Sequence, residues 1–170
     1  MDYASAVSLI MNLVDLERYW GKLHGTSRYN LSRMHILLDR LGNPHLRVPT
    51  IHVTGTKGKG SVSAMITSIL TEAGYTVGLY TSPHLHSVRE RISLNREPIS
   101  ERMFADLVEE VWPAIDAMCS TGEVGRVTTF ETLTAMAFLC FAQRGVDIQV
   151  VEVGLGGTLD ATNVVESPLV

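Results

Sequence analysis

Apolar positions near the start of the chain recur at helical spacing. Over residues 3–20 they follow three- and four-residue steps, the period of a helix with one buried face. Residues 31–41 repeat this period, which stops at Gly42 and Pro44. A glycine can take the left-handed conformation that ends a helix, and a proline cannot continue one. The pattern therefore predicts two helices in this part of the chain.

Strand-like and helix-like segments alternate in the rest of the chain. Short β-rich runs predict strands at residues 49–54, 75–81 and 146–154. Helical patterns cover residues 61–74, 101–118 and 128–143. Such alternation predicts an α/β fold, in which right-handed crossovers build a mostly parallel sheet with helices on both faces.

Three local features refine these expectations. Ser100 is expected to cap the helix that follows it, and Thr128 with Glu131 matches a capping box. Residues 82–98 are polar and predict a long loop. The final "ESPLV" resembles the first residues of another strand, so we expect a sheet truncated at its C-terminal end. One ordered domain, or most of one, is the expectation for residues 1–170.

Composition and charge narrow the possible partners. The chain has 170 residues, 45% hydrophobic and 19% charged, with a formal net charge of −4. An acidic balance argues against nucleic acid or an anionic membrane and favours a small anionic ligand. The longest apolar run is too short to cross a membrane and no signal pattern is visible, so the cytoplasm is the expected location. Cys119 and Cys140 are expected to fill the core.

The segment "IHVTGTKGKGS", residues 51–61, joins a predicted strand to a predicted helix. Glycines let backbone N–H groups approach a phosphate, and the helix start supplies positive potential. The segment departs from the pattern G-x-x-x-x-G-K-[ST], because Val53 stands at its first glycine and Gly60 at its hydroxyl, which moves to Ser61. An ordinary glycine-rich turn is the alternative. Phosphate binding is favoured because the flanking elements are of the right type and Lys59 opens the helix.

A second segment, "VVEVGLGGTLDATNVV", spans residues 150–165. Glu152 ends a buried strand ahead of a glycine-rich loop, an arrangement that can hold Mg²⁺ beside a nucleotide. The alternative places Glu152 in solvent at a sheet edge, but its apolar neighbours make that the weaker interpretation. Asp160 and Asn163 could contact a ligand or cap the loop, and capping is at least as well supported.

Together the two segments resemble signatures of folylpolyglutamate synthases and dihydrofolate synthases, within the Mur ligase superfamily. The resemblance covers nearly the whole chain and implies a P-loop NTPase-like fold of the Mur-ligase central-domain type. Residues 1–170 would be the N-terminal part of the ATP-binding domain, with the rest of that domain and a C-terminal glutamate-ligase domain absent. Thr158 departs from the arginine often found in the family at this position.

The resemblance also implies roles for individual residues. ATP phosphates would lie in a cradle whose lysine, Lys59, holds the β- and γ-phosphates, and Lys59 and Glu152 would be the catalytic residues. Mg²⁺ would be held by Ser61, Ser82 and Glu152. The residues of the cradle are Gly55, Thr56, Lys57, Gly58, Lys59, Gly60 and Ser61.

Three more stretches fit the family, and one of them, residues 27–45, looks like its leading helix before the phosphate-binding loop. "TSPHL", residues 81–85, would bring Pro83 and His84 to the pteridine end of the substrate, and "TTFE" would stack Phe130 on the pterin. The alternatives are a simple turn, a solvated histidine and a core phenylalanine. Arg28 and Arg33 are expected as surface charges, while Arg89 and Arg91 would attract anions or solvate their loop.

The resemblance implies ATP-dependent addition of L-glutamate to dihydropteroate or folate through an acyl phosphate. It also implies that the full-length protein is a monomer. The 170-residue piece is expected to bind nucleotide weakly and not to ligate. Two alternatives stay open. The first is another Mur-superfamily ligase, which Gly60 and the "SPHL" loop disfavour. The second is a non-catalytic P-loop nucleotide-binding module, which is disfavoured because the sequence has no guanine-recognition pattern N-K-x-D. The choice between dihydropteroate and folate is open.

Overall fold

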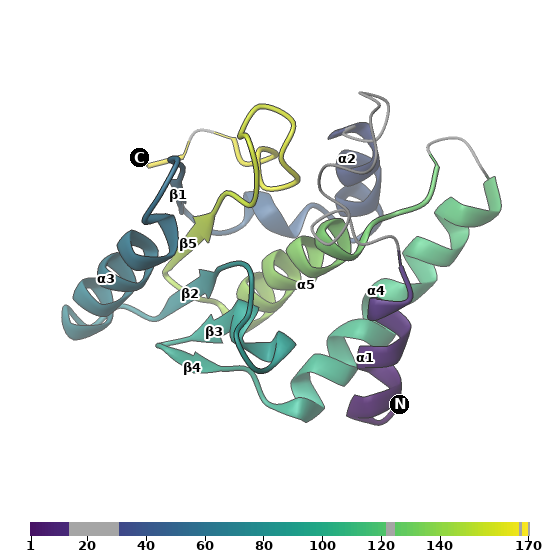
Figure 1. The fold of residues 1–170 in the computed structure, drawn as a ribbon, viewed down its shortest axis with the longest axis horizontal. Coiled ribbons are helices and arrows are strands. Elements are labelled where there is room, and N and C mark those ends of the chain that lie inside the picture. Colours follow the sequence, from purple (N-terminus) through teal and green to yellow (C-terminus); the bar gives the residue numbers. More distant parts are fainter. Residues whose placement is uncertain (14–30, 122–124, 167, 170) are drawn as a thin grey trace.

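The computed structural model describes residues 1–13, 31–121, 125–166, 168 and 169. Within these residues, five α-helices and two short 3₁₀ helices lie around a five-stranded sheet (Figure 1). The helices are α1 (Tyr3–Met11), α2 (Leu31–Arg40), η2 (Pro44–Leu46), α3 (Lys59–Glu72), η3 (Val88–Arg91), α4 (Glu101–Thr121) and α5 (Thr129–Arg144). The strands are β1 (Thr50–Val53), β2 (Val77–Tyr80), β3 (Ile92–Leu94), β4 (Glu97–Pro98) and β5 (Ile148–Glu152).

The sheet has the order β1-β5-β2-β3-β4. Its first three strands are parallel, with His52 opposite Val151 and Leu79 opposite Val150. This part confirms the predicted α/β fold. Leu169, in the segment expected to begin a further strand, donates a backbone hydrogen bond of 2.8 Å to the carbonyl of Thr50 and so lies beside β1.

The expectation of a long loop at residues 82–98 was wrong. The segment folds into η3 and an antiparallel hairpin of β3 and β4, which makes the sheet mixed. Asn95 and Arg96 have φ of 49° and 73°, the left-handed values that a tight two-residue turn between strands requires. Asparagine takes such values readily, but arginine rarely does, so the sequence carries no strong hairpin signal.

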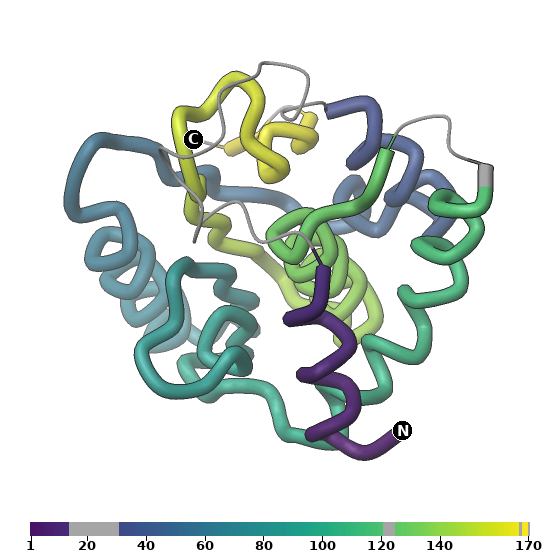
Figure 2. Tube along the Cα trace, turned by 45° about the vertical axis from the view of Figure 1, so that its right-hand side comes forward, coloured from purple at the N-terminus to yellow at the C-terminus, as the bar shows by residue number. Residues whose placement is uncertain are grey.

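Helices cover both faces of the sheet, as predicted. The α3 helix lies on one face, while α5 packs on the other with α1, α2 and α4 around it (Figures 1 and 2). Successive side chains of β2 point to opposite faces of the sheet, which explains why helices pack on both faces. Val77 and Leu79 face α3, while Tyr80 joins the larger core on the other face. Gly78 lets α5 come close, since a Cβ there would lie 2.5 Å from the ring of Phe141.

The predicted caps are confirmed. Thr128 accepts a hydrogen bond from the backbone of Glu131, whose carboxylate accepts one from the backbone of Thr128, and the two bonds complete the capping box of α5. Ser100 accepts from the backbone N–H of Met103 at 3.1 Å and caps α4. The second helix ends as expected, with Gly42 at φ 75°. Residues 14–20 of the first predicted helix lie outside the described residues.

Arg33 does not lie on the surface, contrary to the sequence-based expectation. It is 6% exposed and forms an ion pair with Glu131, with Nη2 2.9 Å and Nε 3.0 Å from Oε1. The cause is the capping box, which buries the carboxylate of Glu131 and so requires a neutralising cation. This pair ties α2 to the start of α5. Arg28 lies outside the described residues.

The two cysteines have different environments. Cys140 is buried in the core, and desolvation raises the pKa of its thiol to about 11. Cys119 is exposed on α4, so the prediction that it fills the core was wrong. Burial of Cys119 was expected because its neighbours in sequence are apolar, but its thiol lies on the solvent side of the helix.

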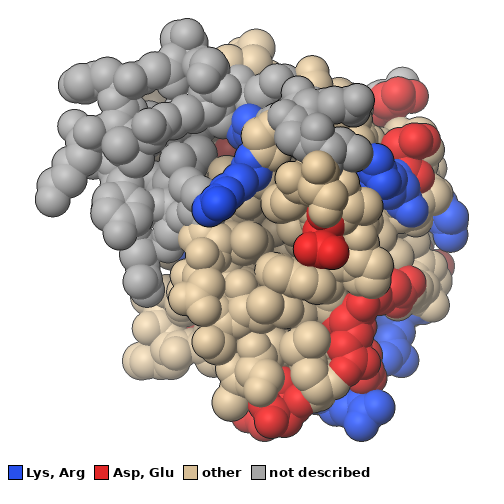
Figure 3. All heavy atoms as spheres, turned by 90° about the vertical axis from the view of Figure 1, so that its right-hand side faces the viewer, with Lys and Arg blue, Asp and Glu red and all other residues tan. Residues whose placement is uncertain are grey.

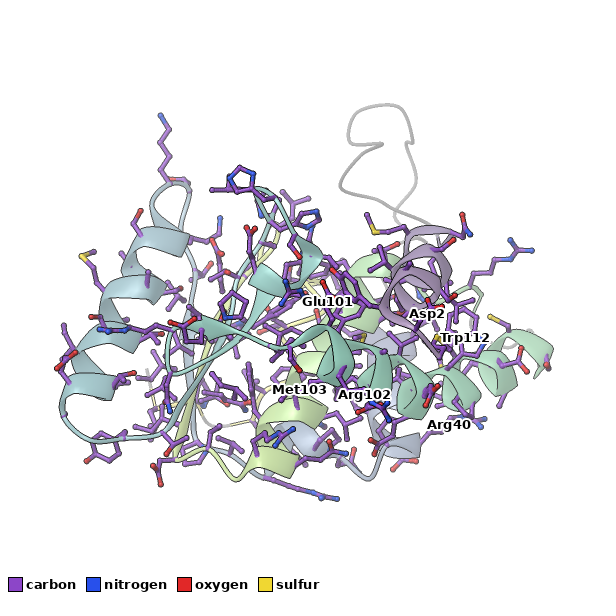
Figure 4. The ribbon with its side chains drawn as sticks, turned by 90° about the horizontal axis from the view of Figure 1, so that it is seen from below. Asp2, Arg40, Glu101, Arg102, Met103 and Trp112 are labelled. Carbon is purple, nitrogen blue, oxygen red and sulfur yellow. The ribbon has the colours of Figure 1, made fainter. Side chains whose placement is uncertain are left out.

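The outer surface carries charges of both signs. Acidic and basic side chains lie next to one another on the face in Figure 3. Figure 4 shows Asp2, at the start of α1, close to α4, whose Glu101, Arg102, Met103 and Trp112 are labelled. The Met1 amino group pairs with Glu109 of α4. Within the described ranges, none of the helices is long and apolar enough to span a membrane.

Candidate nucleotide site

The carboxyl ends of β1, β5 and β2 meet at one edge of the sheet, because the three strands are parallel. Three segments singled out from the sequence follow these ends. They are residues 55–61 after β1, here called the phosphate loop, residues 153–165 after β5, and Ser82 after β2. A crevice outside the carboxyl ends of parallel strands is where α/β sheets bind ligands. The fold therefore brings together segments that lie about 100 residues apart.

The phosphate loop leads directly into α3. Gly58 has φ 75° and is the N-cap, and Lys59 is the first helical residue. Residues with a Cβ rarely adopt such a φ, which accounts for glycine at position 58. The first part of the Lys59 side chain lies close to Gly55, since a Cβ added to Gly55 would be 3.8 Å from Lys59 Cγ. Lys57 is exposed, so the two lysines have different positions relative to the cradle.

Glu152 is 5% exposed at the end of β5, which rules out the alternative of a solvated edge residue. Its Oε2 accepts a hydrogen bond of 3.0 Å from the backbone N–H of Ser82. A Cβ added to Gly60 would lie 3.5 Å from both carboxylate oxygens, so the first turn of α3 borders the carboxylate. The positive end of a helix stabilises a negative charge at this position.

The donor set suits a hard divalent cation. Mg²⁺ is usually held by one or two carboxylates together with hydroxyls, waters and substrate phosphates. Glu152 supplies one buried carboxylate, Ser61 lies in the first turn of α3, and Ser82 follows β2. No group of three or more His, Cys, Asp or Glu side chains that could hold a metal occurs among the residues described.

The loop after β5 is held by Asp160. This buried carboxylate accepts from the backbone N–H of Leu155 at 2.7 Å and from the hydroxyl of Thr162 at 2.6 Å. Thr162 in turn lies 2.9 Å from Nε2 of His52 on β1. Asp160 therefore caps the loop, one of the two possibilities that the sequence left open. Asn163 does so as well, donating to the carbonyl of Thr158 at 3.1 Å.

His52 was not singled out in the sequence. Its pKa is lowered by desolvation, with Asp160 acting in the opposite direction. Its partners are more than 100 residues away in sequence, and no local signal marks them. The chain Asp160, Thr162 and His52 fixes the loop to β1, and Gly157 lies close to Thr54, directly before the phosphate loop, where a Cβ would be 3.9 Å from Thr54 Oγ1.

Phe130 lies at the start of α5 against the same loop. A Cβ added to Gly154 would lie 2.5 Å from Cζ of Phe130, and the ring centroid of Tyr80 is 6.0 Å away. Phe130 is partly buried and packs against the core. The structure thus places Phe130 against Gly154, two residues after the end of β5 at Glu152, and the absence of a Cβ at position 154 makes that approach possible.

The two arginines of the predicted loop contact protein groups. Arg91 is 5% exposed, and its Nε donates to Nδ1 of His84 at 3.0 Å. Arg89 donates to the carbonyl of Ile99 at 2.9 Å and lies over the ring of Tyr3. The suggestion that Arg91 solvates its loop was wrong, because the hairpin folds over it. His84 is half-buried beside it, and Pro83 is exposed.

Comparisons with known proteins agree with the fold. A dihydrofolate synthase/folylpolyglutamate synthase of Bacillus subtilis is 47% identical over 154 residues, which cover 88% of this chain and 35% of that protein. The crystal structure of folylpolyglutamate synthase from Thermotoga maritima superposes with a TM-score of 0.86 at 46% identity, over 98% of this chain and 36% of the other. No protein-family model matches the chain.

A folylpolyglutamate synthase solved as a complex with AMPPCP and folate has a TM-score of 0.86 at 39% identity, over 99% of this chain and 39% of the other. These matches define the class, an α/β protein with the Mur-ligase fold. Within that class, the chain belongs with the folylpolyglutamate and dihydrofolate synthases, and the resemblance predicted from the sequence is confirmed. The chain spans about a third of the length of these relatives.

Proposed function

We propose that the chain is the nucleotide-binding part of an ATP-dependent ligase that adds L-glutamate to dihydropteroate, folate or both. The observation that carries this proposal is the position of Glu152, buried beside Gly60 at the point where the phosphate loop enters α3. The names of the relatives support it, as does the AMPPCP and folate complex of a structural neighbour. They favour a folate-type ligase over another Mur-superfamily ligase or a non-catalytic nucleotide-binding module.

In this proposal the phosphate loop holds the nucleotide. Backbone N–H groups of residues 55–61 converge on the phosphates, and Lys59 supplies a positive charge to the β- and γ-phosphates. Lys59 is the better candidate of the two lysines because it is partly buried and its Cγ lies close to Gly55, whereas Lys57 is exposed. Thr56 follows Gly55 in the cradle, and like Lys57 it is exposed.

The chemistry is the activation of a carboxylate. A carboxylate does not react with an amine directly, because its oxygen is a poor leaving group, so transfer of a phosphoryl group to form an acyl phosphate must come first. The residues near the phosphates align the two reactants and neutralise charge as the phosphoryl group moves. Mg²⁺, which Glu152, Ser61 and Ser82 would hold, supplies further charge neutralisation when bound.

The substrate would lie against the loops after β2 and β5. Pro83 and His84 follow Ser82, whose backbone contacts Glu152, and Phe130 packs on Gly154, two residues after Glu152. An exposed part of an aromatic ring offers a surface for a planar heterocycle. We assign Pro83, His84 and Phe130 to the pteridine end of the substrate, with the reactive carboxylate towards Lys59.

Three further points belong to the same proposal. Residues 1–170 would form part of a nucleotide-binding domain and act with segments equivalent to the remaining two thirds of the relatives. The protein would be cytoplasmic and would act as a monomer on small molecules, without nucleic acid or membrane. The chain by itself would bind ATP without ligating, so a coupled assay should detect no glutamate-dependent release of ADP.

Calorimetric titration with ATP in the presence of Mg²⁺ tests the cradle. Lys59→Ala should weaken ATP binding by about 10- to 100-fold, the range expected for losing a charge-assisted hydrogen bond of ~1.5–3 kcal/mol. Lys57→Ala is the matched control and should stay within about twofold of the parent chain, because it keeps the backbone N–H that the cradle uses and removes only an exposed charge, which contributes little. Equal effects of the two substitutions would contradict the assignment of Lys59.

A further inference from the structure

The loop that follows Ser82 is held by a carboxylate. Glu90 accepts hydrogen bonds from the backbone N–H groups of Leu85, His86 and Ser87 at 2.8, 3.0 and 2.7 Å. These bonds lower the pKa of Glu90, with the one from Leu85 contributing most. Ser87 and Glu90 also form a capping box at the start of η3. The turn next to His84 is therefore fixed by its own side chains.

Arg91 ends η3 and is anchored at the sheet. Its carbonyl accepts from the backbone N–H of Thr81 at 3.0 Å, one residue before Ser82, whose N–H in turn contacts Glu152. Its side chain is 5% exposed and reaches back to His84, with Nε 3.0 Å from Nδ1. A charged group is rarely buried so deeply without a specific polar contact.

The chemistry of the two side chains determines which nitrogen of His84 carries the proton. An arginine guanidinium only donates hydrogen bonds, so Nδ1 of His84 has to accept. A neutral imidazole that accepts at Nδ1 carries its hydrogen on Nε2. The bond from Arg91 also fixes the plane of the ring, as a partner on one ring nitrogen does for metal-bound histidines.

We propose that Arg91 is a positioning residue, which holds His84 as a neutral donor with its N–H on Nε2 for an acceptor atom of the bound substrate. Suitable acceptors are a ring nitrogen or a carbonyl oxygen of a heterocycle. The donor role towards a ligand rests on the proposed function, since His84 lies two residues from Ser82 in the candidate site. The tautomer of His84 does not depend on it.

Long-range ¹H–¹⁵N NMR spectra of the labelled chain test the tautomer. At mildly alkaline pH, where histidine rings are neutral, His84 should show an unprotonated Nδ1 and a protonated Nε2. A His84→Gln variant assigns its signals. Arg91→Met should convert these signals to a mixture of tautomers, and Arg89→Met, which removes a neighbouring guanidinium without a histidine contact, should leave them unchanged. A proton on Nδ1 in the parent chain overturns the proposal even if Arg91→Met does not fold.

Addition of folic acid to the same samples tests the donor role. Signals of the ring nitrogens of His84 should move, and the dissociation constant should rise by about 10-fold in Arg91→Met, as expected for loss of one hydrogen bond of ~1.4 kcal/mol. If other signals move and those of His84 do not, folate binds but the donor role is overturned. If no signal moves, the folate part of the proposed function fails together with the donor role, while the tautomer result stands by itself.

Discussion

The backbone N–H of Ser82 donates a hydrogen bond to Oε2 of Glu152 at 3.0 Å, and the bond joins the carboxyl ends of the neighbouring strands β2 and β5. Because the donor is a backbone group, replacing the side chain of Ser82 leaves the bond in place. The orientation of the carboxylate is therefore set by the sheet and is independent of the hydroxyl that would accompany it at a metal ion.

Replacing Glu152 by glutamine removes the negative charge of the side chain and keeps its size. Glu152→Gln keeps an oxygen that can accept from Ser82, so the free energy of unfolding should change by less than about 1 kcal/mol. Loss of the charge should weaken ATP binding in the presence of Mg²⁺ by about 10-fold or more and leave binding without Mg²⁺ nearly unchanged. Calorimetry with and without Mg²⁺ measures both quantities.

Glu97→Gln serves as the control for that substitution, because Glu97 is exposed on β4, away from the carboxyl ends of the parallel strands. It should behave as the parent chain in both titrations. Mg²⁺-dependent binding that survives in Glu152→Gln would show that the metal is held by other groups.

Gly78→Ala should destabilise the fold. The added Cβ would lie 2.5 Å from the ring of Phe141, a distance that forces β2 and α5 apart. Overpacking of this kind costs about 1–3 kcal/mol. Urea denaturation should show this loss, and in the Phe141→Leu background the same substitution should cost less, since the smaller side chain leaves room. Additive costs in the double variant would mean that the ring is not the obstacle.

Two buried threonines should respond in opposite directions to valine. Thr67 of α3 is fully buried, and its hydroxyl has no hydrogen-bond partner in the described structure, so Thr67→Val should stabilise the protein by about 1 kcal/mol. The hydroxyl of Thr134 donates to Phe130 O at 2.8 Å and lies 3.0 Å from Tyr80 Oη, so Thr134→Val should destabilise it by a similar amount. Chemical denaturation measures both, and effects of the same sign would refute this account.

Stability should fall as the pH drops below about 6.5. Desolvation lowers the pKa of His45 and of His52 from the ordinary value of 6.5, so the folded protein binds protons less readily than the unfolded chain in this range. The free energy of unfolding then rises with pH up to about 6.5 and levels off above it. Denaturant titrations at several pH values between about 5 and 8 give the slope.

The contribution of His52 can be isolated. His52→Gln keeps a donor for Thr162 but does not titrate, so the slope below about pH 6.5 should be smaller than in the parent chain. His86→Gln is the matched control, since His86 is exposed and its side chain can be changed without touching the core. A slope that is the same in all three chains would rule out His52 as a source of the pH dependence.

Sequence patterns predicted those elements whose signals are local. The helix after Thr128 has its capping box within four residues, and the strand that ends at Glu152 is mostly isoleucine and valine, with Gln149 as the exception, so both were found. The β3–β4 hairpin was missed because Arg96 occupies a left-handed position where a glycine would have been the signal. Tertiary packing there overrides a weak local preference.

The candidate site was predictable to a similar extent. The spacing of glycines and lysines indicated the phosphate loop, and the apolar neighbours of Glu152 indicated its burial. The partners of Arg33 and His52 lie 98 and 110 residues away, so neither the burial of Arg33 nor the contact of His52 has a local signature. The bond between Arg91 and His84 also depends on the hairpin, and was missed with it.

The three backbone bonds to Glu90 have an entropic consequence for ligand binding. Fixing the backbone of one residue costs about 1–2 kcal/mol, and in residues 85–87 this cost is met when the protein folds. A ligand that arrives at His84 therefore meets a loop with few conformers left to lose, and more of its contact energy remains as affinity.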